Sequence, residues 1–206
     1  NQLIPRAKLD VATAMQKVQP ILESVKSGNQ ENLLALCQEF DGIKPKSIKV
    51  PKAILENALA SLNAEVKAAL ETAAARITKV HQDQVRNVKI SKLEDGAIVT
   101  EKWIPVDRVG LYVPGGRAVY PSSVLMNVIP AQIAKVPSIA VASPPQVDND
   151  GWPNQTILAT CALLGIDEVY AIGGAQAIAL FAYGMNEVCE KADLVTGPGN
   201  IYVAAA

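Results

Sequence analysis

The sequence predicts an α/β protein in which a helical amino-terminal segment precedes a doubly wound parallel sheet. Apolar residues in the first part of the chain recur at spacings of three and four, the period of an amphipathic helix. In the second part, short continuous apolar runs alternate with helical stretches, as expected for strands buried on both faces. The chain has 206 residues, of which 50% are hydrophobic, and can therefore bury a sizeable core.

Residues 10–84 carry the helical pattern, and turn-forming residues divide it into several helices. Gly28-Asn29 precede one helix and Asp41-Gly42 end it, while Pro51 stands where a further helix begins. Pro20 is expected to break or kink the first helix, because proline lacks the amide hydrogen that an interior position donates. The clearest amphipathic stripe consists of Val66, Leu70, Ala73, Ile77 and Val80.

After Gly96 the periodicity changes. Ile98, Thr100 and residues 103–106 belong to an extended, polar-interrupted pattern, which is typical of exposed or hairpin strands. This stretch is predicted to close the helical segment.

A domain boundary is predicted near Arg108. Residues 1–108 then form the helical segment with short strands, as part of a first domain, and residues 109–206 form a Rossmann-like domain whose sheet is incomplete at its carboxyl end. Apolar strands that alternate with helices indicate crossover units and hence a parallel sheet. The predicted strands are residues 109–113, 138–142, 168–172 and 193–195, and the helices between them are residues 123–134, 155–164 and 175–182.

Glycine-rich loops follow three of these strands: Pro114-Gly115-Gly116, Gly173-Gly174 and Gly197-Pro198-Gly199. Ligands of doubly wound sheets bind beyond the carboxyl ends of the strands, and glycine lets backbone N–H groups approach a ligand closely. Gly173-Gly174 also precede a helix, whose free amide groups favour an anion such as pyrophosphate. Glycines at strand ends can equally make ordinary tight turns, and no loop matches a G-x-G-x-x-G or P-loop pattern. The loops therefore predict a nucleotide or phosphate ligand without choosing between them.

Three polar side chains beside these glycines are candidate ligand contacts. The amides of Gln176 and Asn200 can donate and accept hydrogen bonds together. Tyr112 offers a ring for stacking and a hydroxyl for a ribose or phosphate.

Charge and cysteine usage exclude several classes of protein. The 19 basic and 20 acidic residues are interspersed, which leaves no basic patch for nucleic acid or anionic lipid. No apolar stretch reaches the ~18 residues of a membrane span, and the start lacks signal-peptide architecture. The three cysteines suggest no disulfide framework, so a reducing cytoplasm is expected. The scattered Cys37, Cys161 and Cys189 are interpreted as structural, and His81 as a surface or satisfied residue rather than a metal ligand.

The loops and their flanks resemble the histidinol dehydrogenase family. The resemblance is specific from residue 109 onward and weaker before it, where the helical layout and Glu39-Phe40-Asp41-Gly42 are similar. Its motifs are VGLYVPGG (109–116), PSSVLM (121–126), IPAQ (129–132), ASPP (142–145), GGAQAI (173–178), AYG (182–184) and TGPGNIYV (196–203).

The resemblance implies NAD-dependent oxidation of L-histidinol to L-histidine through the aldehyde, in two hydride transfers, as the last step of histidine biosynthesis. It also implies a zinc ion and a homodimer. Carried over position by position, the family's NAD contacts fall on Tyr112, Gln176 and Asn200. The family's substrate serine, zinc ligands and acid/base pair are expected beyond residue 206, so the resemblance implies no catalytic or metal-binding residue in this chain, which would be inactive alone.

Two alternatives remain open. The first is a related dehydrogenase of the same family that acts on another hydroxyl compound, such as a sulfonated diol. The second is a non-catalytic fragment that binds a nucleotide or an interaction partner. Because the chain lacks an initiator methionine and ends just after a loop, it is expected to be part of a longer polypeptide.

Overall fold

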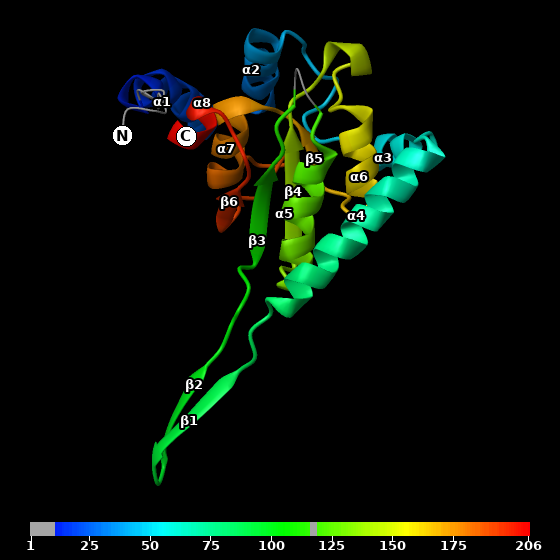
Figure 1. Ribbon diagram of the computed structural model, residues 1–206. Coiled ribbons are helices and arrows are strands. Elements are labelled where there is room, and N and C mark those ends of the chain that lie inside the picture. Colours follow the sequence, from blue (N-terminus) through cyan, green and yellow to red (C-terminus); the bar gives the residue numbers. More distant parts are fainter. Residues whose placement is uncertain (1–10, 116–118) are drawn as a thin grey trace, which may run out of the picture.

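The structure, a computed structural model, describes residues 11–115 and 119–206. A four-stranded parallel sheet lies between layers of helices, and a two-stranded hairpin projects away from it (Figure 1). This arrangement confirms the predicted α/β fold with a helical amino-terminal segment. Gly116 of the first glycine-rich loop lies outside the described residues.

The amino-terminal segment forms four helices, and its predicted punctuation is confirmed at both ends of the second. The Asn29 side chain accepts hydrogen bonds from the backbone N–H groups of Glu31 and Asn32, and Gly42 ends the helix with a left-handed φ of 76°. The first helix continues through Pro20, so the predicted break does not occur; the carbonyl of Gln16, which loses its partner there, belongs to an exposed residue. The four helices are α1 (Val11–Ser27), α2 (Gln30–Asp41), α3 (Lys52–Ala60) and α4 (Ala64–Asp83).

The central sheet has the strand order β5-β4-β3-β6, with every neighbouring pair parallel. The chain thus starts in the middle of the sheet, moves outward to one edge, and returns to place its last strand on the other side of the first. The strands are β3 (Arg108–Tyr112), β4 (Ser138–Ser143), β5 (Val169–Ala171) and β6 (Leu194–Thr196). The remaining helices are α5 (Pro121–Ile133), η1 (Val147–Asn149), α6 (Gln155–Leu163), α7 (Gly174–Tyr183) and α8 (Ile201–Ala205).

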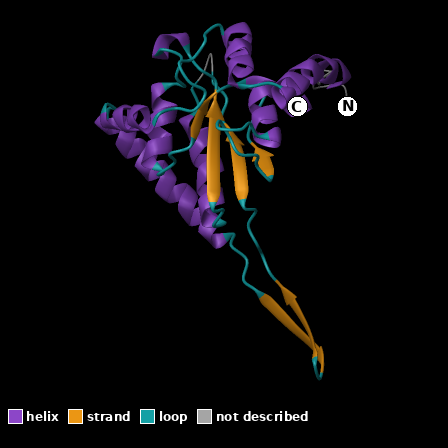
Figure 2. Cartoon of the chain, turned by 180° about the vertical axis from the view of Figure 1, so that it is seen from behind, coloured by secondary structure: helices purple, strands orange, loops and turns teal. Residues whose placement is uncertain are grey.

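Helices cover both faces of this sheet, as Figure 2 shows from behind. Successive side chains of a strand point to opposite faces. Val109 and Leu111 of β3 accordingly pack in one core cluster with residues of α3, α5 and α6, whereas Tyr112 packs in the other with residues of α1, α2, α7 and α8. Both faces are buried, which confirms the doubly wound arrangement.

Arg108 joins the starting ends of the strands. Its guanidinium forms an ion pair with Glu168 at 2.5 Å, just before β5, and donates a hydrogen bond to the Ser138 hydroxyl of β4. Its backbone N–H donates to the carboxylate of Asp193 at 2.8 Å, just before β6. Because Arg108 is only 7% exposed, these contacts satisfy a charge that would otherwise be costly to bury.

The amino-terminal segment also contributes to the sheet itself. The Val50 N–H donates to the Val169 carbonyl at 2.8 Å, and the Ala171 N–H donates to the Ile48 carbonyl at 2.7 Å, so residues 48–50 cover the free edge of β5. Helix α3 packs against α6 within the same core cluster. The two parts of the chain therefore share a core, and the domain boundary near Arg108 stays a prediction.

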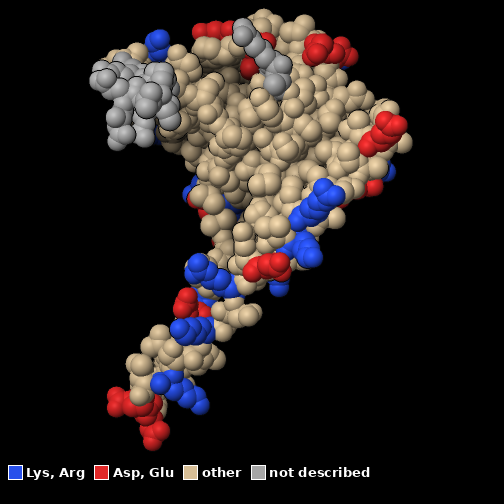
Figure 3. Space-filling view, viewed as in Figure 1, with Lys and Arg blue, Asp and Glu red and all other residues tan. Residues whose placement is uncertain are grey.

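The projecting hairpin pairs β1 (Lys89–Glu94) with β2 (Ala97–Glu101) in antiparallel register. We call residues 85–104 the arm. Acidic and basic side chains are mixed along it (Figure 3), and eight of its large apolar side chains are exposed. These are Val85, Val88, Ile90, Leu93, Ile98, Val99, Trp103 and Ile104.

Among the described helices, none combines the length and the apolar character that crossing a membrane requires.

Candidate functional site

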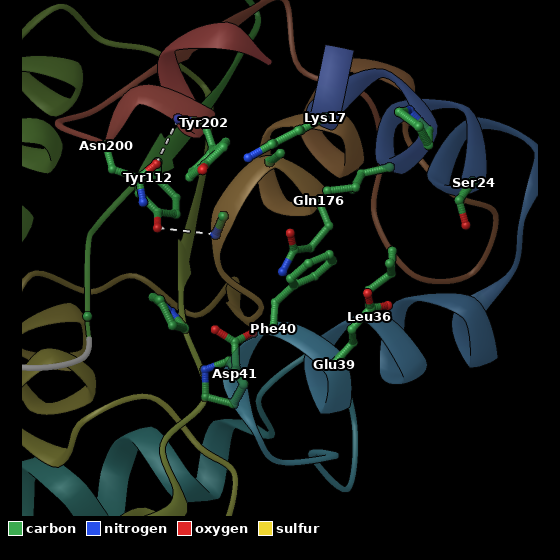
Figure 4. Close-up of a pocket in the computed structure, with 17 residues that line it drawn as sticks. Lys17, Ser24, Leu36, Glu39, Phe40, Asp41, Tyr112, Gln176, Asn200 and Tyr202 are labelled. Carbon is green, nitrogen blue, oxygen red and sulfur yellow. Dashed lines mark hydrogen bonds between the residues drawn. The ribbon is translucent and has the colours of Figure 1, made fainter. Parts of the chain in front are cut away.

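A cavity of about 940 Å³ lies beyond the carboxyl ends of the strands (Figure 4). Its wall includes Tyr112, Gln176 and Asn200, so the structure brings the three predicted contact residues together. Side chains from α1 and α2 also line it, together with residues of the loops that follow β3 and β4. The reversal of strand order between β3 and β6 places Tyr112 and Asn200 at the switch point of the sheet, where ligands of doubly wound folds bind.

Tyr112 is the last residue of β3 and is only 5% exposed. Its hydroxyl oxygen accepts a hydrogen bond of 3.2 Å from the backbone N–H of Gly174, at the start of α7. Burial raises the pKa of this phenol, and the Asp41 carboxyl adds to the shift. The Tyr112 hydroxyl is therefore neutral and already satisfies one backbone N–H of the helix terminus.

Gln176 lies in the first turn of α7 and is 2% exposed, yet its Nε2 has no hydrogen-bond partner. An amide that leaves water without a partner costs about 1–3 kcal/mol. Gly174 makes room for it: a Cβ on Gly174 would lie 2.8 Å from the Gln176 Oε1, and the φ of Gly174 is +59°. The amide is thus held at the helix terminus with a donor free for a ligand.

Asn200 has a structural role as well as a place in the cavity wall. Its Oδ1 accepts hydrogen bonds from the backbone N–H groups of Tyr202 at 2.9 Å and Val203 at 3.1 Å, which caps α8. Its Nδ2 has no partner among the residues that the structure describes and remains available as a donor. The loop before it crosses β3 so closely that a Cβ on Gly197 would lie 2.1 Å from the Tyr112 carbonyl oxygen.

Asp41 also lines the cavity, although its sequence context predicted a helix end and a point of family resemblance rather than a ligand contact. Its Oδ2 is buried without a hydrogen-bond partner, and burial raises the pKa of its carboxyl to about 6. The third buried unpartnered atom among the described side chains is the Ser143 Oγ, next to the lining residue Pro144. The unsatisfied polar atoms of the described chain thus gather around one cavity.

His81 and the three cysteines lie outside the cavity. His81 accepts or donates a 2.8 Å hydrogen bond with Gln84 on the surface of α4, in agreement with its interpretation as a satisfied residue. All three cysteines are buried, and burial raises the pKa of Cys37 and Cys161 to about 12. Within residues 11–115 and 119–206, no group of three or more His, Cys, Asp or Glu side chains could hold a metal ion.

Taken together, the strand order, the two covered faces and the cavity at the switch point define a doubly wound α/β protein of the Rossmann-like class. A sequence model of the histidinol dehydrogenase family matches residues 4–206. The chain therefore belongs to the histidinol dehydrogenase family.

Individual relatives agree with this assignment. The histidinol dehydrogenase of Thermobifida fusca (strain YX) is 61% identical over 203 residues, which are 98% of this chain and 46% of that protein. That of Streptomyces avermitilis is 55% identical over 206 residues, 100% of this chain and 46% of its own length. The crystal structure of histidinol dehydrogenase from Elizabethkingia anophelis superposes with a TM-score of 0.87 at 33% identity, covering 98% of this chain and 45% of that one. The chain spans about half the length of the curated relatives it matches.

Proposed function

We propose that this chain forms the NAD-binding side of an enzyme that oxidises L-histidinol to L-histidine through the aldehyde, the last step of histidine biosynthesis. The observation that carries the proposal is the unpartnered Nε2 of Gln176, which is held at a helix terminus in the wall of the cavity. The names of the relatives supply the substrate. The overall conversion consumes two NAD⁺ and one water per alcohol oxidised to a carboxylate.

The described residues fit a dinucleotide by the chemistry of their free groups. The first turn of α7 offers backbone N–H groups to a pyrophosphate, and the Gln176 and Asn200 amides offer further donors. Tyr112 is positioned to donate its hydroxyl hydrogen to an oxygen of the ligand while it keeps the bond from Gly174. When bound, NAD supplies the hydride acceptor; the residues of this chain bind and orient it.

Further parts of the proposal concern the whole enzyme. We propose a zinc ion, a homodimer and a cytoplasmic location, as the family resemblance implies. Because the described residues provide no cluster of metal ligands, we derive no role for them in holding zinc.

The test uses Gln176→Ala and Asn200→Ala in the full-length protein, with Gln82→Ala on the exposed surface of α4 as a matched control. Each cavity variant removes a hydrogen-bond donor, so we expect the KM and Kd for NAD to rise roughly tenfold. The KM for L-histidinol should stay near that of the parent, and Gln82→Ala should change neither constant. An unchanged NAD dependence in both cavity variants would refute the assignment of these residues.

A further inference from the structure

Asp41 adds a buried hydrogen-bond acceptor to a cavity in which the unpartnered Gln176 Nε2 is a donor. It is the last residue of α2, and the left-handed Gly42 that follows turns the chain away and fixes the position of the carboxyl. Figure 4 shows the carboxyl directed toward the cavity, beside Phe40. A carboxylate has only acceptor sites, so a group that satisfies its buried Oδ2 must be a hydrogen-bond donor.

The carboxyl lies next to the turn that precedes α7. A Cβ on Gly173 would lie 3.1 Å from the Asp41 Oδ1 and 2.7 Å from the Pro144 Cγ, so both residues lie beside the position where Gly173 has no side chain. A pyrophosphate held by the amides of this turn would be repelled by a carboxylate. In a dinucleotide, the hydrogen-bond donors nearest to the pyrophosphate are the ribose hydroxyls.

The strand order indicates which ribose this is. In doubly wound dinucleotide sites, an acidic residue after the second strand accepts a hydrogen bond from the adenosine 2′-hydroxyl. The second strand of this sheet is β4, and the residues that follow it are Pro144, Pro145 and Gln146, none of which is acidic. Asp41 reaches the same end of the sheet from α2 and lies beside Pro144, on the β4–β5 side of the switch point.

We propose that Asp41 accepts a hydrogen bond from the adenosine 2′-hydroxyl of the dinucleotide and thereby selects NAD over its 2′-phosphorylated form, NADP. This inference rests on the proposed function, because it assumes a dinucleotide in the cavity. A 2′-phosphate at this place would meet a carboxylate. Phe40, Pro144 and Gly173, which lie near Asp41, offer no cation to a phosphate. The lining residue Lys17 extends from α1, and Figure 4 shows Gln176 between it and Asp41 in this view.

The test measures dissociation constants of the full-length protein for three ligands: NAD, NADP, and NAD whose adenosine ribose lacks the 2′-hydroxyl. The parent should bind the deoxy ligand roughly tenfold more weakly than NAD, because one charge-assisted hydrogen bond is lost. In Asp41→Asn that difference should fall to about twofold or less, and the ratio of the NADP to the NAD constant should fall roughly tenfold or more. Glu39→Gln is the control, since Glu39 also lines the cavity but is exposed.

The outcomes separate this inference from the function on which it rests. If the parent binds NAD and its deoxy form equally well, Asp41 makes no hydrogen bond to the 2′-hydroxyl. This comparison uses the parent protein alone and does not depend on whether a variant folds. If Asp41→Asn keeps the parent's discrimination, or if Glu39→Gln changes it as much, the inference fails while NAD binding stands. If the parent binds no NAD at all, the proposed function fails with it.

Discussion

The Asp41 carboxyl carries a cost in the ligand-free protein. Burial raises its pKa from 3.8 to about 6, and the neighbouring Cys37 and Tyr112 each have a pKa raised first by burial and further by this carboxyl. Among the residues that the structure describes, no cation forms an ion pair with the Asp41 carboxyl. The folded protein therefore disfavours the ionised form of this residue relative to its protonated form.

We predict that Asp41→Asn is more stable than the parent at pH 8. A carboxyl whose pKa is higher in the folded than in the unfolded state contributes stability that is fully present below pH 3.8 and is lost as the pH rises through about 6. The substitution removes that loss, so the free energy of unfolding at pH 8 should rise by about 1–2 kcal/mol. Urea unfolding without ligand measures it, and the gap should narrow steadily between pH 7 and pH 4.

Glu39→Gln serves as the control here too, because it removes an exposed carboxyl from the wall of the same cavity, and its free energy of unfolding at pH 8 should stay close to that of the parent. A variant Asp41→Asn that is less stable than the parent at pH 8 would mean that the ionised carboxyl has a favourable partner in the folded protein.

At this scale the sequence predicted the loop residues of the site but not Asp41. Tyr112, Gln176 and Asn200 directly follow strands or begin helices beside glycines, so local sequence marks them. Asp41 belongs to a distant helix, and its neighbour Gly42 explains it locally as a helix end. Only the packing of α2 against α7 brings it to the cavity, and no spacing along the chain encodes that contact.

Strand β3 and helix α7 pack closely against each other at Gly110. Gly110 points to the α7 face of the sheet, where a Cβ would lie 2.4 Å from the Cγ of Phe181. Phe181 is fully buried and makes an edge-on contact with Tyr170 at 6.0 Å between ring centroids. The position of α7, and with it that of Gln176, thus depends on the absence of a side chain at Gly110 in β3.

We predict that Gly110→Ala destabilises the protein by about 1–3 kcal/mol, because the added methyl group overpacks a core without free space. Chemical denaturation gives the loss in unfolding free energy. In the background of Phe181→Leu, a smaller residue, the same substitution should cost less than half as much, and this coupling identifies the Phe181 contact as the cause. Equal costs in both backgrounds would place the strain elsewhere.

The elements themselves were largely predictable, because burial on both faces leaves continuous apolar runs. All four strands of the parallel sheet begin and end within two residues of their predicted limits. β1 was not predicted, since Lys89, Lys92 and Glu94 dilute its apolar alternation. The pairing of residues 48–50 with β5 was equally hidden, because it depends on a partner that the chain reaches much later.

The molecule as a whole divides its apolar surface unevenly. The main body buries β3 and β5 completely, whereas the arm exposes side chains such as Leu93 at 70% and Ile98 at 59%. An isolated two-stranded hairpin is marginally stable in water, and exposed apolar strand edges promote association. The exposed apolar side chains of the arm are therefore expected to promote contact with other polypeptide surfaces.

We predict that the double substitution Leu93→Lys and Ile98→Lys lowers the self-association of this chain, which light scattering over a range of concentrations measures. Both side chains lie outside the core, so the melting temperature should change little. Val147→Lys, which adds a charge to a 68% exposed position on the body, is the control and should have a weaker effect. If the control lowers association as strongly as the double variant, net charge rather than the arm is responsible.

The arm also carries one of the chain's two tryptophans, Trp103, whose ring lies 4.6 Å from the Arg86 guanidinium and is 57% exposed. The other, Trp152, is 8% exposed within the core beside the sheet. A solvent-exposed indole emits at longer wavelength than a buried one, and iodide in solution quenches only the exposed one. The intrinsic fluorescence of this chain consequently has two components. The long-wavelength component, from Trp103, reports on the surroundings of the arm, and the short-wavelength component, from Trp152, reports on whether the core remains folded.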